Sequence, residues 1–575
     1  MKFGKLEMNP AENPAVLDTA TWDRAAAWKA IDGSDCNWAL VRKEPALAGA
    51  TSAQGSKLQL HAPSAAETSS ATLFLASLPD GQDVLLRIGD GNIQELGEPL
   101  GQKRLSSGET LSAYPTDADV LDRFCRKFKP EKGSRRLGAT PRLGVGTRMT
   151  SSVWPGIFQA MTQRGFATNA IQNSVRELNL LEPLLAGAPP EKNYSTGIGT
   201  IECGWTGSTY EGLWVAGVLA ALKWDGPLRY GADADHVQVK RGADGLDRAK
   251  RVLRAARYYS FYTLDMADVL DYAALDERSA AVAERFLSQR IPGRAERAGV
   301  LEYHQQPLRL GSHLVQLDAA AVGRFVGKYW DALAMLEELA RFIAGLKEEP
   351  DFDLELTIDE HPPEVAAFDC LTTNEEVLFL AREIQRRRLP VTHLAPNFGQ
   401  EKGYDYRCPD GLDGLERRAQ AQFQIAKEFG LMLDVHSGDD LTSAPRRVFQ
   451  RATGGQVHFK VSPQLQLLYA ELLQEFHPDL FDRWWQDALA YAEREAANGS
   501  PVAQSCLAKL RSSPNPGSSW RHPVFHYFSF PFVGRRDAHG QFLNRQEFYR
   551  LSAAFNRAYE QRICDYLCEL ADDLF

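Results

Sequence analysis

The chain has 575 residues, of which 44% are hydrophobic and 24% are charged, and its formal net charge is −10 at pH 7. This composition is typical of a globular protein that is long enough for more than one domain. The acidic balance argues against a nucleic acid or an anionic membrane surface as a partner. No apolar run approaches the roughly 20 residues that a membrane span requires.

The eight cysteines are scattered along the sequence and form no CxxC pair. This pattern favours reduced thiols over a disulfide framework or a metal clip. The segment from Met1 to Met8 lacks the apolar core of a secretory signal. We therefore expect a cytoplasmic protein.

Residues 1–137 are expected to form an N-terminal β-rich accessory domain. Short apolar strands at 71–76 and 84–88 are joined by a turn at Pro79-Asp-Gly81, which is typical of an antiparallel meander. The basic stretch 126–136 follows, and its run of charges predicts a solvated linker.

From Pro141 onward, short apolar segments alternate with amphipathic ones. Eight segments are predicted strands, namely Arg142–Gly146, Phe166–Gln172, Leu228–Ala234, Tyr258–Leu264, Leu354–Asp359, Val391–Ala395, Leu431–Val435 and Gln456–Phe459. A capping box of Thr373 and Glu376 predicts the start of one helix. Further helices are expected over 329–346 and 415–429.

Strands that alternate with helices pair in parallel, and eight repeats predict a closed (β/α)8 barrel of the TIM type over residues 138–475. Insertions are expected after the second and fourth strands. An open doubly wound sheet is the main competing topology. Residues 476–575 are mostly helical, and this extension is expected to pack over the barrel or to mediate assembly into a homo-oligomer.

Three histidines stand at the ends of predicted strands: His236 on the third, His436 on the seventh and His458 on the eighth. The carboxyl ends of barrel strands meet at one mouth, where such enzymes place their chemistry. Neutral imidazoles that converge there suit a divalent metal ion, and zinc, manganese and nickel are all compatible. The alternative is that each is a hydrogen-bonded interior histidine.

Carboxylates accompany these histidines. Asp235 directly precedes His236, and the fifth strand ends in Asp359 and Glu360, of which only one can point into the barrel. The inward carboxylate of that pair is expected to be a metal ligand or a proton carrier. The alternative is a helix-capping or loop carboxylate.

Other polar residues at strand ends are candidates for substrate binding. Arg148 ends the first strand, where a guanidinium could clamp a carboxylate, and Gln172 ends the second. Ser437 and Asp439 follow the seventh strand and suit either sugar hydroxyls or the cap of the next helix. Lys460, near the end of the eighth strand, could hold an anionic oxygen or extend into solvent.

The motifs at these strand ends resemble those of the metal-dependent tagaturonate epimerases, over about residues 140–475. In the order of that family, they are Gly144-Val-Gly-Thr-Arg148, Gln172-Asn-Ser-Val-Arg-Glu177, Gly231-Ala-Asp-Ala-Asp-His236, Ile358-Asp-Glu360, Leu394-Ala-Pro396, Val435-His-Ser-Gly438 and Val457-His-Phe-Lys460. The resemblance implies a barrel, a bound divalent metal, and a small-molecule substrate, with interconversion of the keto-acids tagaturonate and fructuronate.

By this resemblance, His236, His436 and His458 bind the metal, and Asp235 and Glu360 transfer protons. The two ketoses differ at the carbon β to the ketone, so removal of an α-proton cannot invert it. Retro-aldol cleavage promoted by the metal, followed by aldol re-formation, inverts that carbon. No dinucleotide fingerprint supports the competing route through transient oxidation.

The sequence departs from the family near the first strand and after the seventh. Where the family has G-D-R and then A-T-P-G-H, this chain has Gly146-Thr-Arg148 and then Ser151-Ser-Val-Trp-Pro-Gly-Ile157; its Gly438-Asp-Asp440 replaces G-S-D. Trp154, inside the altered motif, is expected to pack against the C–H face of a sugar. The alternatives are an epimerase, isomerase or aldolase for a neutral ketohexose, and a catalytically inactive carbohydrate-binding relative.

Overall fold

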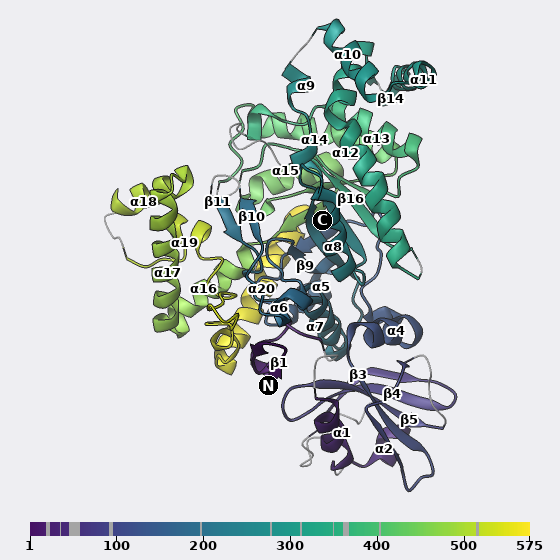
Figure 1. The fold of residues 1–575 in the computed structure, drawn as a ribbon, viewed down its shortest axis with the longest axis vertical. Coiled ribbons are helices and arrows are strands. Elements are labelled where there is room, and N and C mark those ends of the chain that lie inside the picture. Colours follow the sequence, from purple (N-terminus) through teal and green to yellow (C-terminus); the bar gives the residue numbers. More distant parts are fainter. Residues whose placement is uncertain are drawn as a thin grey trace.

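The structure is a computed structural model that describes residues 1–575 except 19–22, 35, 45–57, 91–95, 196–197, 277–278, 311–312, 349, 360–366, 402–403 and 513–516. At its centre, eight parallel strands form a closed barrel (Figure 1). They are β8 (Arg142–Val145), β9 (Ala167–Ser174), β12 (Tyr230–Gln238), β13 (Phe261–Asp265), β16 (Asp353–Thr357), β17 (His393–Ala395), β18 (Met432–Val435) and β19 (His458–Val461). The predicted (β/α)8 barrel is confirmed, and the open sheet is wrong because β19 pairs with β8.

Helices cover the outside of the barrel. Those that connect neighbouring strands include α5 (Trp154–Arg164), α7 (Tyr210–Lys223), α8 (Gly245–Ala255), α12 (Ala319–Leu346), α13 (Asn374–Arg387), α14 (Gly411–Glu428) and α15 (Ser443–Thr453). The predicted capping box of α13 is confirmed, since Thr373 and Glu376 each accept a hydrogen bond from the backbone N–H of the other. This pairing satisfies two N–H groups that a helix start leaves open.

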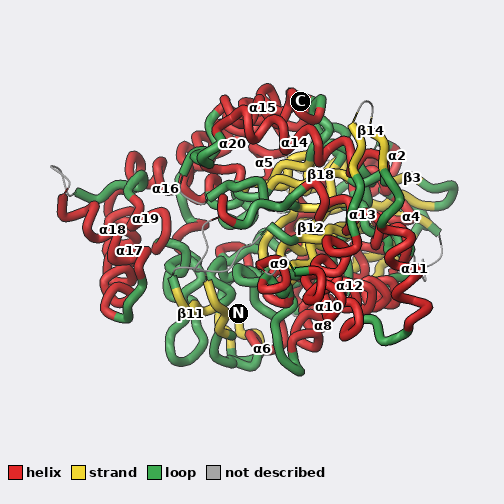
Figure 2. The backbone as a smooth tube through the Cα atoms, turned by 90° about the horizontal axis from the view of Figure 1, so that it is seen from above, coloured by secondary structure: helices red, strands yellow, loops and turns green. Residues whose placement is uncertain are grey.

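The C-terminal segment supplies the last helix of the barrel wall. Helix α20 (Ala553–Leu574) packs against α5 and α15 (Figure 2). Gly156 permits the approach, because a Cβ there would lie 2.7 Å from Ile563 Cβ. The helices that precede α20 are α16 (Gln464–Phe476), α17 (Pro478–Ala497), α18 (Pro501–Ser512) and α19 (Pro523–Phe528). Over the described ranges, no helix is long and apolar enough to cross a membrane.

Insertions follow the second and fourth barrel strands, as predicted. After β9 come α6 (Leu181–Leu185) and an antiparallel hairpin of β10 (Lys192–Ser195) and β11 (Gly199–Glu202). After β13 come α9 (Ala273–Asp276), α10 (Ala280–Arg290), α11 (Arg294–His304) and a second hairpin, β14 (Leu308–Leu310) with β15 (His313–Val315). Because both insertions leave the carboxyl ends of strands, they lie on the side of the barrel where chemistry is expected.

The N-terminal residues form a five-stranded antiparallel sheet in the order β3-β4-β5-β7-β6, after a short hairpin of β1 (Lys2–Phe3) and β2 (Leu6–Glu7). Its strands are β3 (Gln59–Glu67), β4 (Ala71–Ser77), β5 (Asp83–Gly89), β6 (Gly101–Arg104) and β7 (Thr110–Pro115). Leu73 and Leu75 join the core shared with the barrel, whereas Phe74 and Ala76 pack with α1 (Arg24–Asp32) and α2 (Trp38–Lys43). Because successive side chains of β4 point to opposite sides of the sheet, both faces of this strand are buried.

The prediction of a solvated linker at 126–136 is wrong. Helix α4 (Ala118–Phe128) extends into this stretch, and the ammonium group of Lys132 is buried and donates to the carbonyls of Trp224 and Gly226. Carbonyl groups beyond the end of α7 therefore bind a charge that the sequence pattern assigned to solvent. A charge run alone does not reveal such partners.

Asp353, the first residue of β16, anchors the segment that precedes β8 to the amino-terminal end of the barrel. Its fully buried carboxylate lies 3.2 Å from Arg142 Nη1 and accepts hydrogen bonds of 3.1 Å from the N–H groups of Leu137 and Gly138. We predict that Asp353→Asn leaves the Arg142 charge buried without a counter-ion and lowers the free energy of unfolding by about 3–5 kcal/mol. Denaturant unfolding measures the loss. As a control, the exposed Asp351→Asn should shift it by less than about 0.5 kcal/mol; equal losses would contradict the account.

Candidate active site

A pocket opens at the carboxyl ends of the barrel strands. It is lined by Arg148, Gln172, Ser174, Arg176, Glu177, Ile198, Trp205, Asp235, His236, Asp359, His436, Ser437, Asp439, Asp440, Lys460, Val461, Ser462, Pro463, His526, Tyr527 and Phe530. Most of the predicted site residues are in this lining. His458 is not, and Glu360 lies outside the described residues.

His236 and His436 lie side by side in the pocket, with ring centroids 4.8 Å apart. Regular alternation would place Asp235 and His236 on opposite faces of β12. The register of β12 shifts between Ala234 and Val237, and His236 has a positive φ of 48°, so that both residues line the pocket. Backbone conformations that cost energy in this way concentrate at functional sites.

His436 lies between two carboxylates. Its Nε2 is 2.8 Å from Glu355 Oε1 and its Nδ1 is 3.1 Å from Asp359 Oδ2, although neither contact has hydrogen-bond geometry. Burial lowers the pKa of His436, but the carboxylates outweigh burial and raise this pKa to about 10. The site therefore attracts positive charge at this point.

Lys460 lies on the other side of Glu355. Its Nζ is 2.7 Å from Glu355 Oε2 and 3.1 Å from oxygens of both Asp233 and Asp235, and it donates to Thr263 Oγ1 at 2.6 Å. Burial lowers the pKa of Lys460, but these carboxylates raise it well above its ordinary value. Lys460 is thus a fixed positive charge among acidic side chains, and its contact with a substrate oxygen stays a prediction.

His458 lies deeper in the barrel than the other two predicted metal ligands. It is the first residue of β19, and its Nδ1 is 2.8 Å from Asp434 Oδ2. The sequence placed His458 at a strand end because the predicted strand stopped at Phe459, whereas β19 continues to Val461. The structure therefore brings together two of the three predicted histidine ligands.

His458 belongs to a buried group with His393 and Asp434. His393, Asp434 and His458 offer possible ligand atoms within 4.8 Å of one another. Burial, then Lys460 and Arg142, hold the pKa of His458 well below its ordinary value. The imidazole of His458 is therefore neutral. Its hydrogen bond with Asp434 inside the barrel is compatible with the interior role that the sequence left open for this histidine, and its role as a metal ligand stays a prediction.

The pocket also contains donor atoms of the types that divalent cations bind, although among the described residues only His393, Asp434 and His458 bring such atoms within 4.8 Å of one another. His236 Nδ1, both ring nitrogens of His436 and Asp359 Oδ1 are buried and have no hydrogen-bond partner among the described residues. Two imidazoles and a carboxylate form a donor set that zinc, manganese and nickel accept. Glu355 stands behind His436 as carboxylates commonly stand behind metal-binding histidines.

Two arginines line the outer part of the pocket. Arg148 Nε donates to Glu177 Oε1 at 2.8 Å, Nη1 donates to Gln466 Oε1 at 3.3 Å, and the guanidinium carbon lies 5.8 Å from the Trp205 ring centroid. Arg176 also lines the pocket, and its Nε is buried without a hydrogen-bond partner in the described chain. Guanidinium groups therefore face any ligand from this end.

Aromatic side chains complete the pocket. Tyr527 of α19 and Phe530 come from the C-terminal segment, and the ring of Phe530 lies 4.4 Å from that of Trp205. The prediction that Trp154 contacts a sugar is wrong, because Trp154 is 1% exposed and its Nε1 donates to the carbonyl of Ala170 at 2.8 Å. Trp205 and Phe530 provide the aromatic surface instead, and no sequence motif marks them.

The remaining predicted residues differ in how much they offer a ligand. Gln172 Oε1 is buried without a partner in the described chain, so it is available to a hydroxyl group. Asp439 Oδ1 already accepts the N–H groups of Ser462 at 2.8 Å and Gln464 at 3.1 Å, which fixes the turn before α16. Burial, with the nearby Asp440, raises the pKa of Asp439 to about 7.

Histidines, carboxylates and arginines that converge at the carboxyl ends of a (β/α)8 barrel define a barrel enzyme that acts on a small polar molecule. A family model described as UxaE, tagaturonate epimerase, matches residues 202–500, more than half of the chain. The protein belongs to this family, and it is an isomerase of the epimerase class.

Solved structures agree with this fold across nearly the whole chain. The native fructuronate-tagaturonate epimerase UxaE from Cohnella laeviribosi aligns with a TM-score of 0.65 at 20% identity, over 92% of this chain and 99% of that chain. The same enzyme with one glycerol gives a TM-score of 0.65 at 21% identity, over 90% of this chain and 96% of that one. No curated protein matches the chain significantly.

Proposed function

We propose that the protein is a divalent-metal-dependent epimerase that interconverts tagaturonate and fructuronate. Its family membership supports the reaction, and the pair of histidines with unpartnered ring nitrogens beside Asp359 supports the metal. When bound, the ion would act as a Lewis acid on the ketone of the substrate. His236, His436 and Asp359 are the residues that would hold it.

The inverted carbon is β to the ketone, so a carbon–carbon bond must break and re-form. A base removes the proton of the hydroxyl group on that carbon. The bond to the neighbouring carbon then breaks, and its electron pair moves toward the ketone oxygen while an aldehyde forms. After the aldehyde fragment turns, the reverse steps give the other epimer without any net change in atoms or electrons.

Asp235 is suited to be the base. Burial raises its pKa, but His236 and Lys460 outweigh burial and lower this pKa below its ordinary value, so that the carboxylate is ionised. Asp359 contacts the other histidine of the pair, which suits a metal ligand rather than a proton carrier. Glu360, beside Asp359 in the sequence, stays a predicted proton carrier.

The outer end of the pocket supports a substrate that carries a carboxylate. Arg148 and Arg176 present guanidinium groups there, and such groups bind carboxylates with directed hydrogen bonds. Gln172 and Ser437 line the pocket where sugar hydroxyls would lie, and the Trp205 ring offers a face to C–H groups. These features match a hexuronate with its acid group directed outward.

A neutral ketohexose is the second candidate. The observation that favours it is the bond from Arg148 to Glu177, a carboxylate that is 2% exposed and therefore fixed in place. Glu177 offsets the charge of Arg148 inside the protein, which weakens the attraction of Arg148 for an external carboxylate. Recognition of an acid would then depend more on Arg176.

The first prediction concerns the metal. Purified His436→Ala should contain much less zinc, manganese or nickel than the wild type, because the substitution removes a nitrogen donor. Elemental analysis of folded protein measures this. His458→Ala serves as the comparison, since His458 is not in the pocket, and it should retain its metal. Loss of metal only in His458→Ala would reject the site proposed here.

The second prediction concerns the base. Asp235→Asn should reduce turnover of tagaturonate by about 10²-fold or more, the usual scale for removal of a general base. Metal content and melting temperature should stay close to wild type. Asp233→Asn is the matched control, because Asp233 also contacts Lys460 but does not line the pocket. Comparable losses in both variants would make Asp235 a structural residue rather than the base.

The third prediction separates an acid from a neutral substrate. If a hexuronate is bound, Arg148→Met and Arg176→Met should each lower kcat/KM for tagaturonate by about 10- to 100-fold relative to tagatose, as expected for loss of a charged hydrogen bond. Steady-state kinetics on both sugars measures this ratio. Equal effects on the two sugars in both variants, or a wild type that prefers tagatose, would favour the neutral ketohexose.

A further inference from the structure

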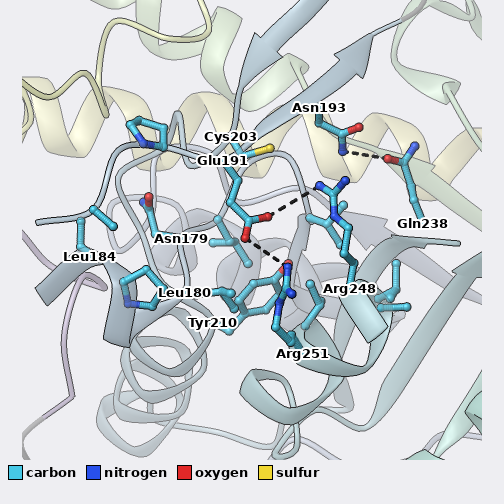
Figure 3. Close-up of a pocket in the computed structure, with 18 of the residues that line it drawn as sticks. Asn179, Leu180, Leu184, Glu191, Asn193, Cys203, Tyr210, Gln238, Arg248 and Arg251 are labelled. Carbon is cyan, nitrogen blue, oxygen red and sulfur yellow. Dashed lines mark hydrogen bonds and ion pairs between the residues drawn. The ribbon is translucent and has the colours of Figure 1, made fainter. Parts of the chain in front are cut away.

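A second pocket, which Figure 3 shows in close-up, shares a wall with the active site according to the residues that line the two cavities. The wall is the end of β12, where Asp235 and His236 line the first pocket, and Val237 and Gln238 line the second. The opposite sides are formed by α8, the hairpin β10–β11 and the segment 178–191. One strand end therefore connects the two cavities.

The second pocket is strongly cationic. Lys240, Arg248, Arg251 and Arg536 line it, whereas Glu191 is the one carboxylate among the described residues of its lining. Lys240 is paired with Asp268 outside the pocket, and Arg536 donates to the carbonyl of Ala188 at 3.0 Å. Arg248 and Arg251, one turn apart on α8, thus remain as the cations that face the cavity, and within the described chain each forms an ion pair with Glu191.

Glu191 holds these two arginines only loosely. Its carboxylate oxygens lie 3.7 Å from Arg248 Nη2 and 3.5 Å from Arg251 Nη2, and its side chain is 51% exposed. Exposed ion pairs at such distances contribute little to stability. The carboxylate of Glu191 therefore occupies a position that suits an anion between the two guanidinium groups. Because it is held loosely, another anion can displace it from this position.

The side chain of Tyr210, whose hydroxyl group is buried, also lines this pocket. The Tyr210 side chain is 1% exposed, yet its hydroxyl has no hydrogen-bond partner in the described part of the chain. Burial raises the pKa of Tyr210 well above its ordinary value, so that the hydroxyl keeps its proton and can donate it. A buried donor without a partner costs free energy, and a ligand oxygen would satisfy it.

We propose that this pocket binds a small organic anion, a carboxylate or a phosphate monoester, whose charged group takes the place of Glu191 between Arg248 and Arg251. Tyr210 donates a hydrogen bond to the body of the ligand, and Leu180 and Leu184 cover its apolar part. The proposal goes beyond the epimerase reaction, because none of these residues lines the active site.

The bound anion is linked to catalysis through a short chain of polar contacts. Asn193 Nδ2 donates to Gln238 Oε1 at 2.9 Å, and Gln238 Nε2 donates to Asp265 Oδ2 at 3.3 Å. The same oxygen of Asp265 lies 3.6 Å from His236 Nδ1. A ligand that forms a hydrogen bond with Gln238 or Asn193 therefore changes the position of Asp265, and with it the orientation of His236. In this proposal the pocket is a regulatory site.

Calorimetric titration of the full-length protein with inorganic phosphate and, separately, with succinate tests the binding and separates the two chemistries. At least one probe should bind, and Arg248→Met/Arg251→Met should weaken it by about tenfold or more. Glu191→Gln should strengthen binding, since it removes the internal competitor. Arg254→Met, also on α8 but outside the pocket, should bind as the wild type does.

Three results would overturn the site: no binding of either probe, equal binding by the double variant, or weaker binding by Glu191→Gln. Loss of binding in Arg148→Met would also overturn it, because the anion would then occupy the active site. These readouts need no substrate, so they stand apart from the outcome for the epimerase reaction.

Turnover measured with a saturating amount of the bound probe tests the link to catalysis. The probe should change kcat/KM of the wild type by about fivefold or more, within the usual range of coupling between sites. In Gln238→Leu, which breaks the polar chain, the probe should still bind without changing turnover. Unchanged turnover in the wild type, or an equal change in Gln238→Leu, would refute the regulatory role.

Discussion

Lys460 places one ammonium group among three buried carboxylates inside the barrel, with Nζ–oxygen distances of 2.7 Å to Glu355 and 3.1 Å to both Asp233 and Asp235. Without that charge, the three carboxylates would repel one another where little water can screen them. The pair of Lys460 with Glu355 also fixes the carboxylate that faces His436. The arrangement of the active site therefore depends on this interaction.

From this centre the acidic side chains orient both histidines. Glu355 and Asp359 lie on either side of His436, and Asp265 stands behind His236. The result is a pair of imidazoles held in a field that favours a cation, which is what a Lewis-acid reaction at a ketone requires. The cationic second pocket lies on the other side of the end of β12 and, among the described residues, shares no lining residue with the active-site pocket.

The sequence predicts the barrel well because most of its strands contain a short apolar stretch and helical segments separate them. It predicts part of the pocket lining, since the rule that chemistry lies at strand ends finds Asp235, His236 and His436. It misplaces His458 in the strand, because β19 begins at His458 and continues to Val461. Tyr527 and Phe530 could not be predicted at all, since tertiary packing alone brings them to the pocket.

A double-mutant cycle of Lys460 and Asp233 tests the central claim most directly. Lys460→Met should lower the free energy of unfolding by about 3–5 kcal/mol, because it leaves buried carboxylates without their counter-ion. Asp233→Asn alone should change the free energy of unfolding only slightly. In the double variant it should restore at least about 1 kcal/mol of the free energy of unfolding that Lys460→Met removes, a coupling energy typical of residues in contact. Strictly additive losses in denaturant unfolding would show that Lys460 does not hold the cluster together.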